Sequence, residues 1–187
     1  MAAVDAMLEE LRGLVPLTPE GAAARFAVRE WAPGGRLRDG VETSWRRDGV
    51  QGWIQAFGGG EVDVSFAVWI RDVDESGYFD DVEAVYAEGE RVLAGFLSEI
   101  EESPLARHLA EAGRTAAAAA AADAAADADA DADEDGDGHG DEFIAVRRWL
   151  LAGRVLTVGV LQHDTDLPVM VVAALREPAP VSVTRGS

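Results

Sequence analysis

The stretch that decides the fold is residues 62–71, VDVSFAVWIR, which has the clearest strand pattern in the 187-residue chain. Side chains point alternately to the two faces of a strand, so every second residue shares a face. The alternation predicts one apolar face and one mixed face: Val62, Val64, Phe66, Val68 and Ile70 on the first, and Asp63, Ser65, Ala67, Trp69 and Arg71 on the second. We expect the apolar face to pack under helices.

Two shorter strand patterns precede this stretch. Residues 41–46 alternate apolar and polar side chains, and Asp48-Gly49 is a favoured two-residue hairpin turn. Residues 50–57 form the returning strand, and glycines at 58–60 reverse the chain again. Three strands joined in this way form a meander, in which neighbouring strands are antiparallel.

Helices are predicted on both sides of this meander. Apolar residues at three- and four-residue steps predict a first helix over residues 4–15. Thr18 is the expected N-cap of a second helix, with Pro19 in its first turn. A long helix over about 79–101 carries an apolar stripe suited to covering a sheet. A shorter helix is expected to begin at Ser103-Pro104.

Three more strands are predicted at the end of the sequence, over residues 143–151, 154–162 and 167–176. The order α-α-β-β-β-α-β-β-β predicts the α+β class, with an antiparallel sheet of five to six strands and helices packed on one face.

The chain has apolar material for one core, since 48% of its residues are hydrophobic. We expect residues 1–113 and 142–178 to form a single α+β domain. Residues 114–141 are rich in Ala and Asp, have little to bury, and predict a disordered acidic insertion. Residues 179–187 are an expected flexible tail.

The charge balance narrows the expected partners. The chain has 35 acidic and 16 basic residues, a formal net charge of −19. This balance argues against nucleic acid or an anionic membrane as the main partner and favours another protein, such as a basic one. With no cysteine, disulfides, thiolate metal sites and cysteine nucleophiles are excluded. No secretory signal is visible and no apolar run is long enough to cross a membrane, so a cytoplasmic location is expected.

Lys and Asn, both encoded by A-rich codons, are absent. Their absence predicts a bacterial source with a GC-rich genome, such as an actinobacterium. The alternative explanation is a salt-adapted protein, whose surface would also be acidic and poor in Lys.

Residues 72–83, DVDESGYFDDVE, match the twelve-residue calcium loop of EF-hand proteins at every ligand position. The expected oxygen donors are Asp72, Asp74, Ser76, Tyr78, Asp80 and Glu83, with Gly77 at the turn. The alternative is a strand end and a turn, followed by acids in the first turn of a helix, where the helix dipole stabilises them. A calcium-binding protein is therefore the first alternative function.

His163 is the one histidine with notable neighbours, Asp164 and Asp166. A histidine beside carboxylates can act as a base, which makes a small hydrolase the second alternative. The competing interpretation is a polar hairpin turn, in which Asp is favoured. No other motif in the sequence assigns a chemical role to a residue. We therefore assign no catalytic, cofactor-binding or metal-binding residue and expect no cofactor.

Four tryptophans fall on predicted strands: Trp45, Trp53, Trp69 and Trp149. Trp69 is expected on the face opposite the apolar row, where it either anchors a partner or packs under a second layer. Arginines also fall on strands, at 46, 47, 147 and 148. One face of the sheet is thus a candidate Arg/Trp surface for protein recognition.

The element order, with Leu17-Thr18-Pro19-Glu20 before a helix and Trp45-Arg46-Arg47-Asp48-Gly49 in a hairpin, resembles the type III secretion chaperone-like fold. That group includes bacterial YbjN-type proteins and small actinobacterial domains, some of them predicted toxin immunity proteins. The insertion departs from the pattern. The resemblance implies a binding or chaperone-like role, often as a homodimer. We therefore expect a non-enzymatic protein-binding module, chaperone-like or immunity-like.

Overall fold

The structure is a computed structural model that describes residues 2–35, 37–38, 41–56, 62–73, 78–111, 143–162 and 167–178. The expected insertion at 114–141, the tail at 179–187 and His163 lie outside these residues.

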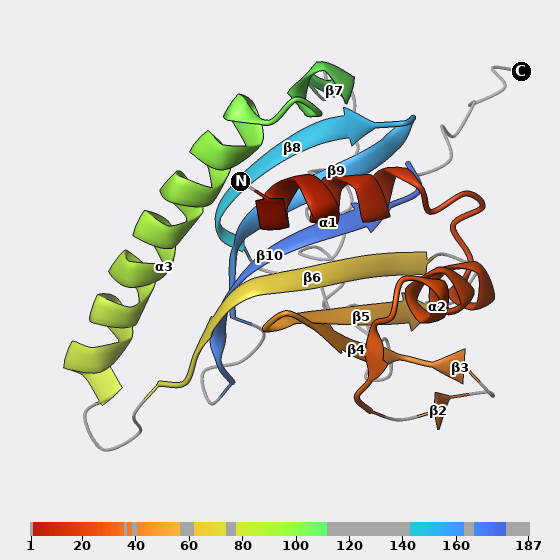
Figure 1. The fold of residues 1–187 in the computed structure, drawn as a ribbon. Helices are drawn as coiled ribbons and strands as arrows, with labels where there is room; N and C mark the ends of the chain where they lie inside the picture. Colours follow the sequence, from red (N-terminus) through yellow and green to blue (C-terminus); the bar gives the residue numbers. More distant parts are fainter. Residues whose placement is uncertain are drawn as a thin grey trace, which may run out of the picture.

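A single antiparallel sheet carries strands from both halves of the sequence. The first half contributes β1 (Ala32–Pro33), β4 (Ser44–Arg47), β5 (Val50–Ala56) and β6 (Val62–Arg71), and the second half contributes β7 (Leu109–Glu111), β8 (Phe143–Leu151), β9 (Arg154–Leu161) and β10 (Val169–Arg176). Their order is β1-β4-β5-β6-β10-β9-β8-β7. Two-residue strands β2 (Leu37–Arg38) and β3 (Val41–Glu42) pair separately. The two meanders meet where β6 pairs with β10 (Figure 1).

The α+β class with an antiparallel sheet is confirmed, but the expected number of five to six strands is wrong, because the sheet has eight. Five of the six predicted strands are observed as β5, β6, β8, β9 and β10, whereas the predicted strand 41–46 is divided between β3 of the small sheet and β4 of the large one. The other two, β1 and β7, are edge strands of two and three residues, too short for a periodic pattern to reveal. The helix expected after Ser103 is also wrong: a single 3₁₀ turn, η3 (Ala106–His108), leads directly into β7.

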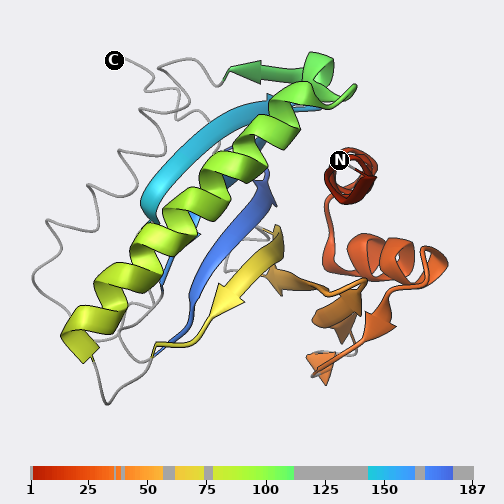
Figure 2. The same ribbon diagram turned by 60° about the vertical axis from the view of Figure 1, so that its left-hand side comes forward.

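Three helices cover one face of the sheet. They are α1 (Ala2–Arg12), α2 (Pro19–Val28) and α3 (Tyr78–Glu102). Figure 2 shows α3 crossing the second meander. On the same side, Figure 1 shows α1 in front of β10, and α2 contacts β5 of the first meander. We call this side the helix face.

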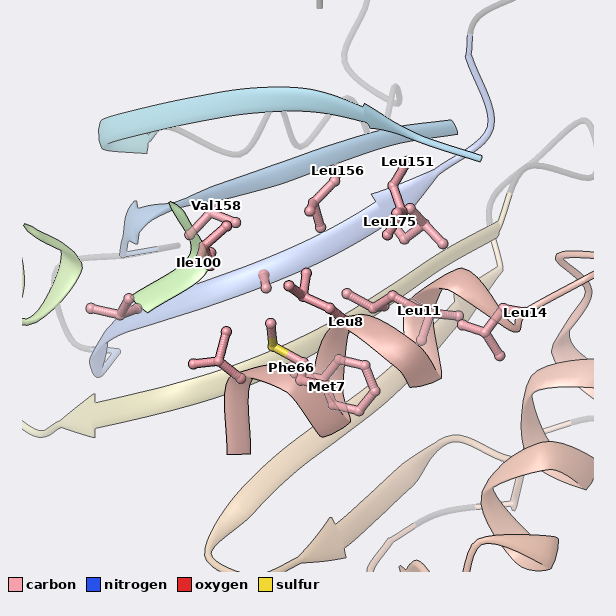
Figure 3. Close-up of a cluster of buried hydrophobic side chains, with 14 of the residues drawn as sticks. Met7, Leu8, Leu11, Leu14, Phe66, Ile100, Leu151, Leu156, Val158 and Leu175 are labelled. Carbon is pink, nitrogen blue, oxygen red and sulfur yellow. The ribbon is translucent and has the colours of Figure 1, made fainter. Parts of the chain in front are cut away.

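The core lies between these helices and the helix face. The Phe26 ring of α2 is 5.6 Å from the Phe66 ring of β6 and 5.7 Å from the Trp45 ring of β4, between ring centroids. Figure 3 shows Leu8 and Leu11 of α1 above the sheet among buried leucines and valines. Gly52 leaves room for this packing, because a Cβ there would lie 3.0 Å from the Phe66 ring.

Two β-bulges interrupt the alternation predicted from the sequence. In β6, Trp69 pairs with Val171 and Ala67 with Val172, so Val68 is an extra residue. A bulge places two residues opposite one and shifts the following side chains to the other face. Trp69 therefore lies on the helix face, where a Cβ on Gly89 of α3 would be 3.4 Å from its ring. The predicted placement of Trp69 opposite the apolar row is wrong, and Ile70 lies on the other face. In β8, Ile144 is the extra residue.

Candidate functional site

The face of the sheet opposite the helices is the candidate site, and we call it the back face. Residues paired across neighbouring strands share a face, so the pairing register defines it in four rows. These rows are Ser44–Trp53–Ser65–Ala174–Thr157–Arg148, Arg46–Gln51–Ala67–Val172–Gly159–Val146, Gln55–Asp63–Arg176–Val155–Leu150 and Ile70–Met170–Leu161–Phe143.

Small, well-buried side chains occupy the middle of the back face. Ala67 is 2% exposed, Val172 and Leu161 are 4% exposed. Trp53, Phe143 and Met170 pack against them and are partly buried. This cluster contains strand residues alone, so it is separate from the core under the helices.

Gly159 leaves room for the Phe143 ring on this face. A Cβ at Gly159 would lie 2.5 Å from a Phe143 ring atom and 2.5 Å from the Ala145 carbonyl oxygen. Contacts that short do not occur between real atoms, so the ring occupies the space that a side chain at 159 would take. The glycine thereby makes an aromatic ring part of the surface.

Exposed apolar side chains surround the cluster. Ile70 is 37% exposed and Val146 is 41% exposed, and Ile144 in the β8 bulge is 40% exposed. Isolated exposed apolar residues are common on proteins, but a contiguous group is typical of an interaction surface. No helix or strand in the described part of the chain lies over the back face.

The charged groups of the back face are mainly arginines. Arg46 and Arg148 lie in two of the rows, and Arg176 pairs with Asp63 through a 2.6 Å contact between Nε and Oδ2. The Asp63 side chain, 3% exposed, is the one carboxylate in the four rows. The predicted Arg/Trp surface therefore exists in part: Arg46, Arg148 and Trp53 share the back face, whereas Arg47, Arg147 and three of the four strand tryptophans do not.

The calcium hypothesis remains a prediction, because residues 74–77 of its loop lie outside the described residues. Asp72 and Glu83, at its two ends, are exposed. The loop follows strand β6, whereas an EF-hand loop follows a helix. Among the residues that the structure describes, no group of three potential metal ligands comes together. The hypothesis requires one saturable calcium site that Glu83→Gln abolishes.

The hydrolase hypothesis remains a prediction as well. His163, Asp164 and Asp166 lie outside the described residues, between Gln162 and Leu167. Gln162 accepts a hydrogen bond from the Tyr86 hydroxyl of α3 at 2.5 Å. A hollow of about 280 Å³ at the β4–β5 turn is lined by residues 46–51, among which Asp48 is the single acid and there is no histidine.

Comparison with protein-family models, with curated proteins and with solved structures finds no match in any of the three. The resemblance to the secretion-chaperone-like group therefore stays a prediction. None of the helices in the described ranges has the length and apolar character needed to cross a bilayer.

What sequence reasoning missed is the joint position of Trp53, Met170 and Phe143. These residues come from three strands far apart in the sequence, and their common face depends on the pairing of β6 with β10 and on the bulge in β8. Trp53 alone was visible as a strand aromatic. No local pattern connects it with Met170.

Proposed function

We propose that this chain is a non-enzymatic protein-binding module, chaperone-like or immunity-like, that docks a partner protein on the back face of its sheet. A cytoplasmic location belongs to the same proposal.

One observation carries the proposal: the composition of the back face. Protein interfaces are enriched in aromatic residues, Met and Arg and depleted in acidic residues and Lys. The four rows contain Trp53, Phe143, Met170 and three arginines, with a single buried carboxylate. In a chain with 35 acidic residues, a face with this composition differs from the average composition of the sequence.

The proposal is tested by placing a charge on the back face and comparing it with the same change elsewhere. Val146 of β8 is 41% exposed, and Val28 at the end of α2 is 81% exposed and off the back face. An Asp at either position keeps contact with water, because both side chains are at least 41% exposed. Affinity capture from a lysate of the source organism is performed with the wild type, Val146→Asp and Val28→Asp.

We expect Val146→Asp to lose the captured partner and Val28→Asp to retain it. Both variants should keep the circular dichroism spectrum and thermal midpoint of the wild type, since surface substitutions usually change stability by less than about 0.5 kcal/mol. Equal capture by all three proteins, or equal loss in both variants, contradicts docking on the back face.

A further inference from the structure

The net charge of the chain is distributed unevenly between the two sides of the sheet. Helix α3, on the helix face, has eight acidic residues and one arginine between Tyr78 and Glu102. The four rows of the back face have three arginines and one carboxylate, Asp63, which is buried against Arg176. The acidic residues of the described strands and helices therefore lie mainly on surfaces other than the back face.

The arginines lie at the margins of the apolar cluster. Arg46 is on β4, near one edge of the sheet, and Arg148 is on β8, five strands away and near the opposite edge. Because neighbouring strands are about 4.8 Å apart, the two backbones are roughly 24 Å apart. Arg176 is at the end of β10 between them. This separation suits the contact region of a protein and is too wide for a single small anion.

Arg46 and Arg148 make no ion pair within the described part of the chain. A partner carboxylate would form a charge-assisted hydrogen bond with either guanidinium. A lysine or arginine of a partner would lie beside the arginines of the back face and be repelled by them. The four rows offer no exposed carboxylate with which it could pair. Contacts within a few ångströms outweigh distant charges, because physiological salt screens exposed charges beyond about 8 Å.

Resting on the function proposed above, we infer that the partner on the back face is an acidic protein, whose contact segment presents carboxylates beside apolar side chains. The apolar side chains cover Trp53 and Met170, and the carboxylates reach Arg46 and Arg148. This inference replaces, for the back face, the basic partner that the net charge predicts.

The two methionines near the sheet make this testable in the intact chain. Met170 lies on the back face, whereas Met7 belongs to α1 and is buried in the core on the helix face. With methyl-¹³C methionine, the Met170 signal reports binding at the back face and the Met7 signal is an internal control. The probes are two synthetic twelve-residue peptides in which Leu alternates with Glu in one and with Lys in the other.

We expect the Glu peptide to shift the Met170 signal saturably and to leave the Met7 signal unchanged. The double variant Arg46→Glu, Arg148→Glu should bind the Glu peptide about tenfold or more weakly than the wild type, which corresponds to about 1.4 kcal/mol. It should bind the Lys peptide instead, with a shift of the Met170 signal. The matched control Arg91→Glu, on α3, should behave as the wild type.

Other outcomes overturn the inference in distinguishable ways. If the Lys peptide shifts Met170 of the wild type as strongly as the Glu peptide does, docking stands and the acidic partner is wrong. If neither peptide shifts Met170 and Val146→Asp captures the same partner as Val28→Asp, the proposed function fails too.

Two further measurements exclude other occupants. A wild-type dimer in sedimentation that Val146→Asp converts to a monomer would assign the face to a second copy. A shift of Met170 on replacing residues 114–141 with a Gly/Ser linker, without peptide, would assign it to this chain's own acidic segment. Either result overturns the inference.

Discussion

Thr18 stabilises the first turn of α2 through its side-chain oxygen, which accepts a hydrogen bond from the Gly21 amide at 3.0 Å. The residue has extended backbone angles and precedes Pro19, as an N-cap does. We predict that Thr18→Ala lowers the free energy of unfolding by about 1 kcal/mol, measured by urea denaturation.

Thr18→Ser is the control, because it keeps the accepting oxygen and removes the methyl group. It should unfold close to the wild-type midpoint. If Ser destabilises the protein as much as Ala does, the methyl group and not the cap stabilises this turn.

The sequence predicted this cap because the cap depends on neighbours three residues apart. The buried carboxylate Glu10 could not be predicted in the same way. It pairs with Arg25 at 2.9 Å and with Arg29 at 3.4 Å, and those contacts depend on how α1 and α2 cross. No periodicity in a single sequence reports that crossing.

Two glycines in α3 differ in what a methyl group would meet. A Cβ at Gly95 would have no heavy atom within 4 Å, whereas a Cβ at Gly89 would lie 3.1 Å from Val160 and 3.4 Å from the Trp69 ring. Glycine in a helix interior is less stable than alanine by about 0.5–1 kcal/mol. We predict that Gly95→Ala raises the free energy of unfolding by that amount.

Gly89→Ala is the matched variant in the same helix. The contact with β9 should cancel the gain in helix stability, so its midpoint should lie at or below that of the wild type. Equal stabilisation by both substitutions would show that α3 does not approach the sheet as closely as described.

Long elements were predictable from periodicity, and irregular ones were not. The predicted helix over 79–101 is observed as Tyr78–Glu102, and the predicted strand 143–151 as Phe143–Leu151. The Asp48-Gly49 turn was predictable because both residues adopt positive φ, 51° and 82°. The bulge at Val68 was not, since an extra residue keeps the strand extended while reversing which side chains face the core. Because of that reversal, Trp69 lies on the helix face and Ile70 on the back face. Part of the candidate site was therefore assigned to the wrong face in the prediction.

At the scale of the whole molecule, the second meander is held by its pairing with the first. β10 pairs with β6 over eight residue pairs, from Val169 with Arg71 to Arg176 with Asp63. None of these paired residues falls within 114–141. We predict that replacing residues 114–141 with an eight-residue Gly/Ser linker leaves the thermal midpoint and the circular dichroism spectrum unchanged.

A linker is needed because Glu111 pairs with Trp149, six residues from Phe143, a span of about 20 Å along the strand. The replacement removes nine acids and one arginine and brings the net charge from −19 to −11. A large loss of stability in this variant would show that the segment belongs to the folded core. A direct fusion of residue 113 to 142 is too short for the span, and we expect it to detach β7.

The central position of β10 has a consequence for synthesis of the chain. Arg176 and Asp63, which pair across β10 and β6, are 113 residues apart. At about 5–20 residues per second, a ribosome needs roughly 5–20 s to cover that distance. Throughout this interval the open edge of β6 lacks the neighbour with which it pairs in the finished protein. Unpaired strand edges are aggregation-prone, so the newly made first half exposes such an edge until translation delivers the strand that completes the sheet.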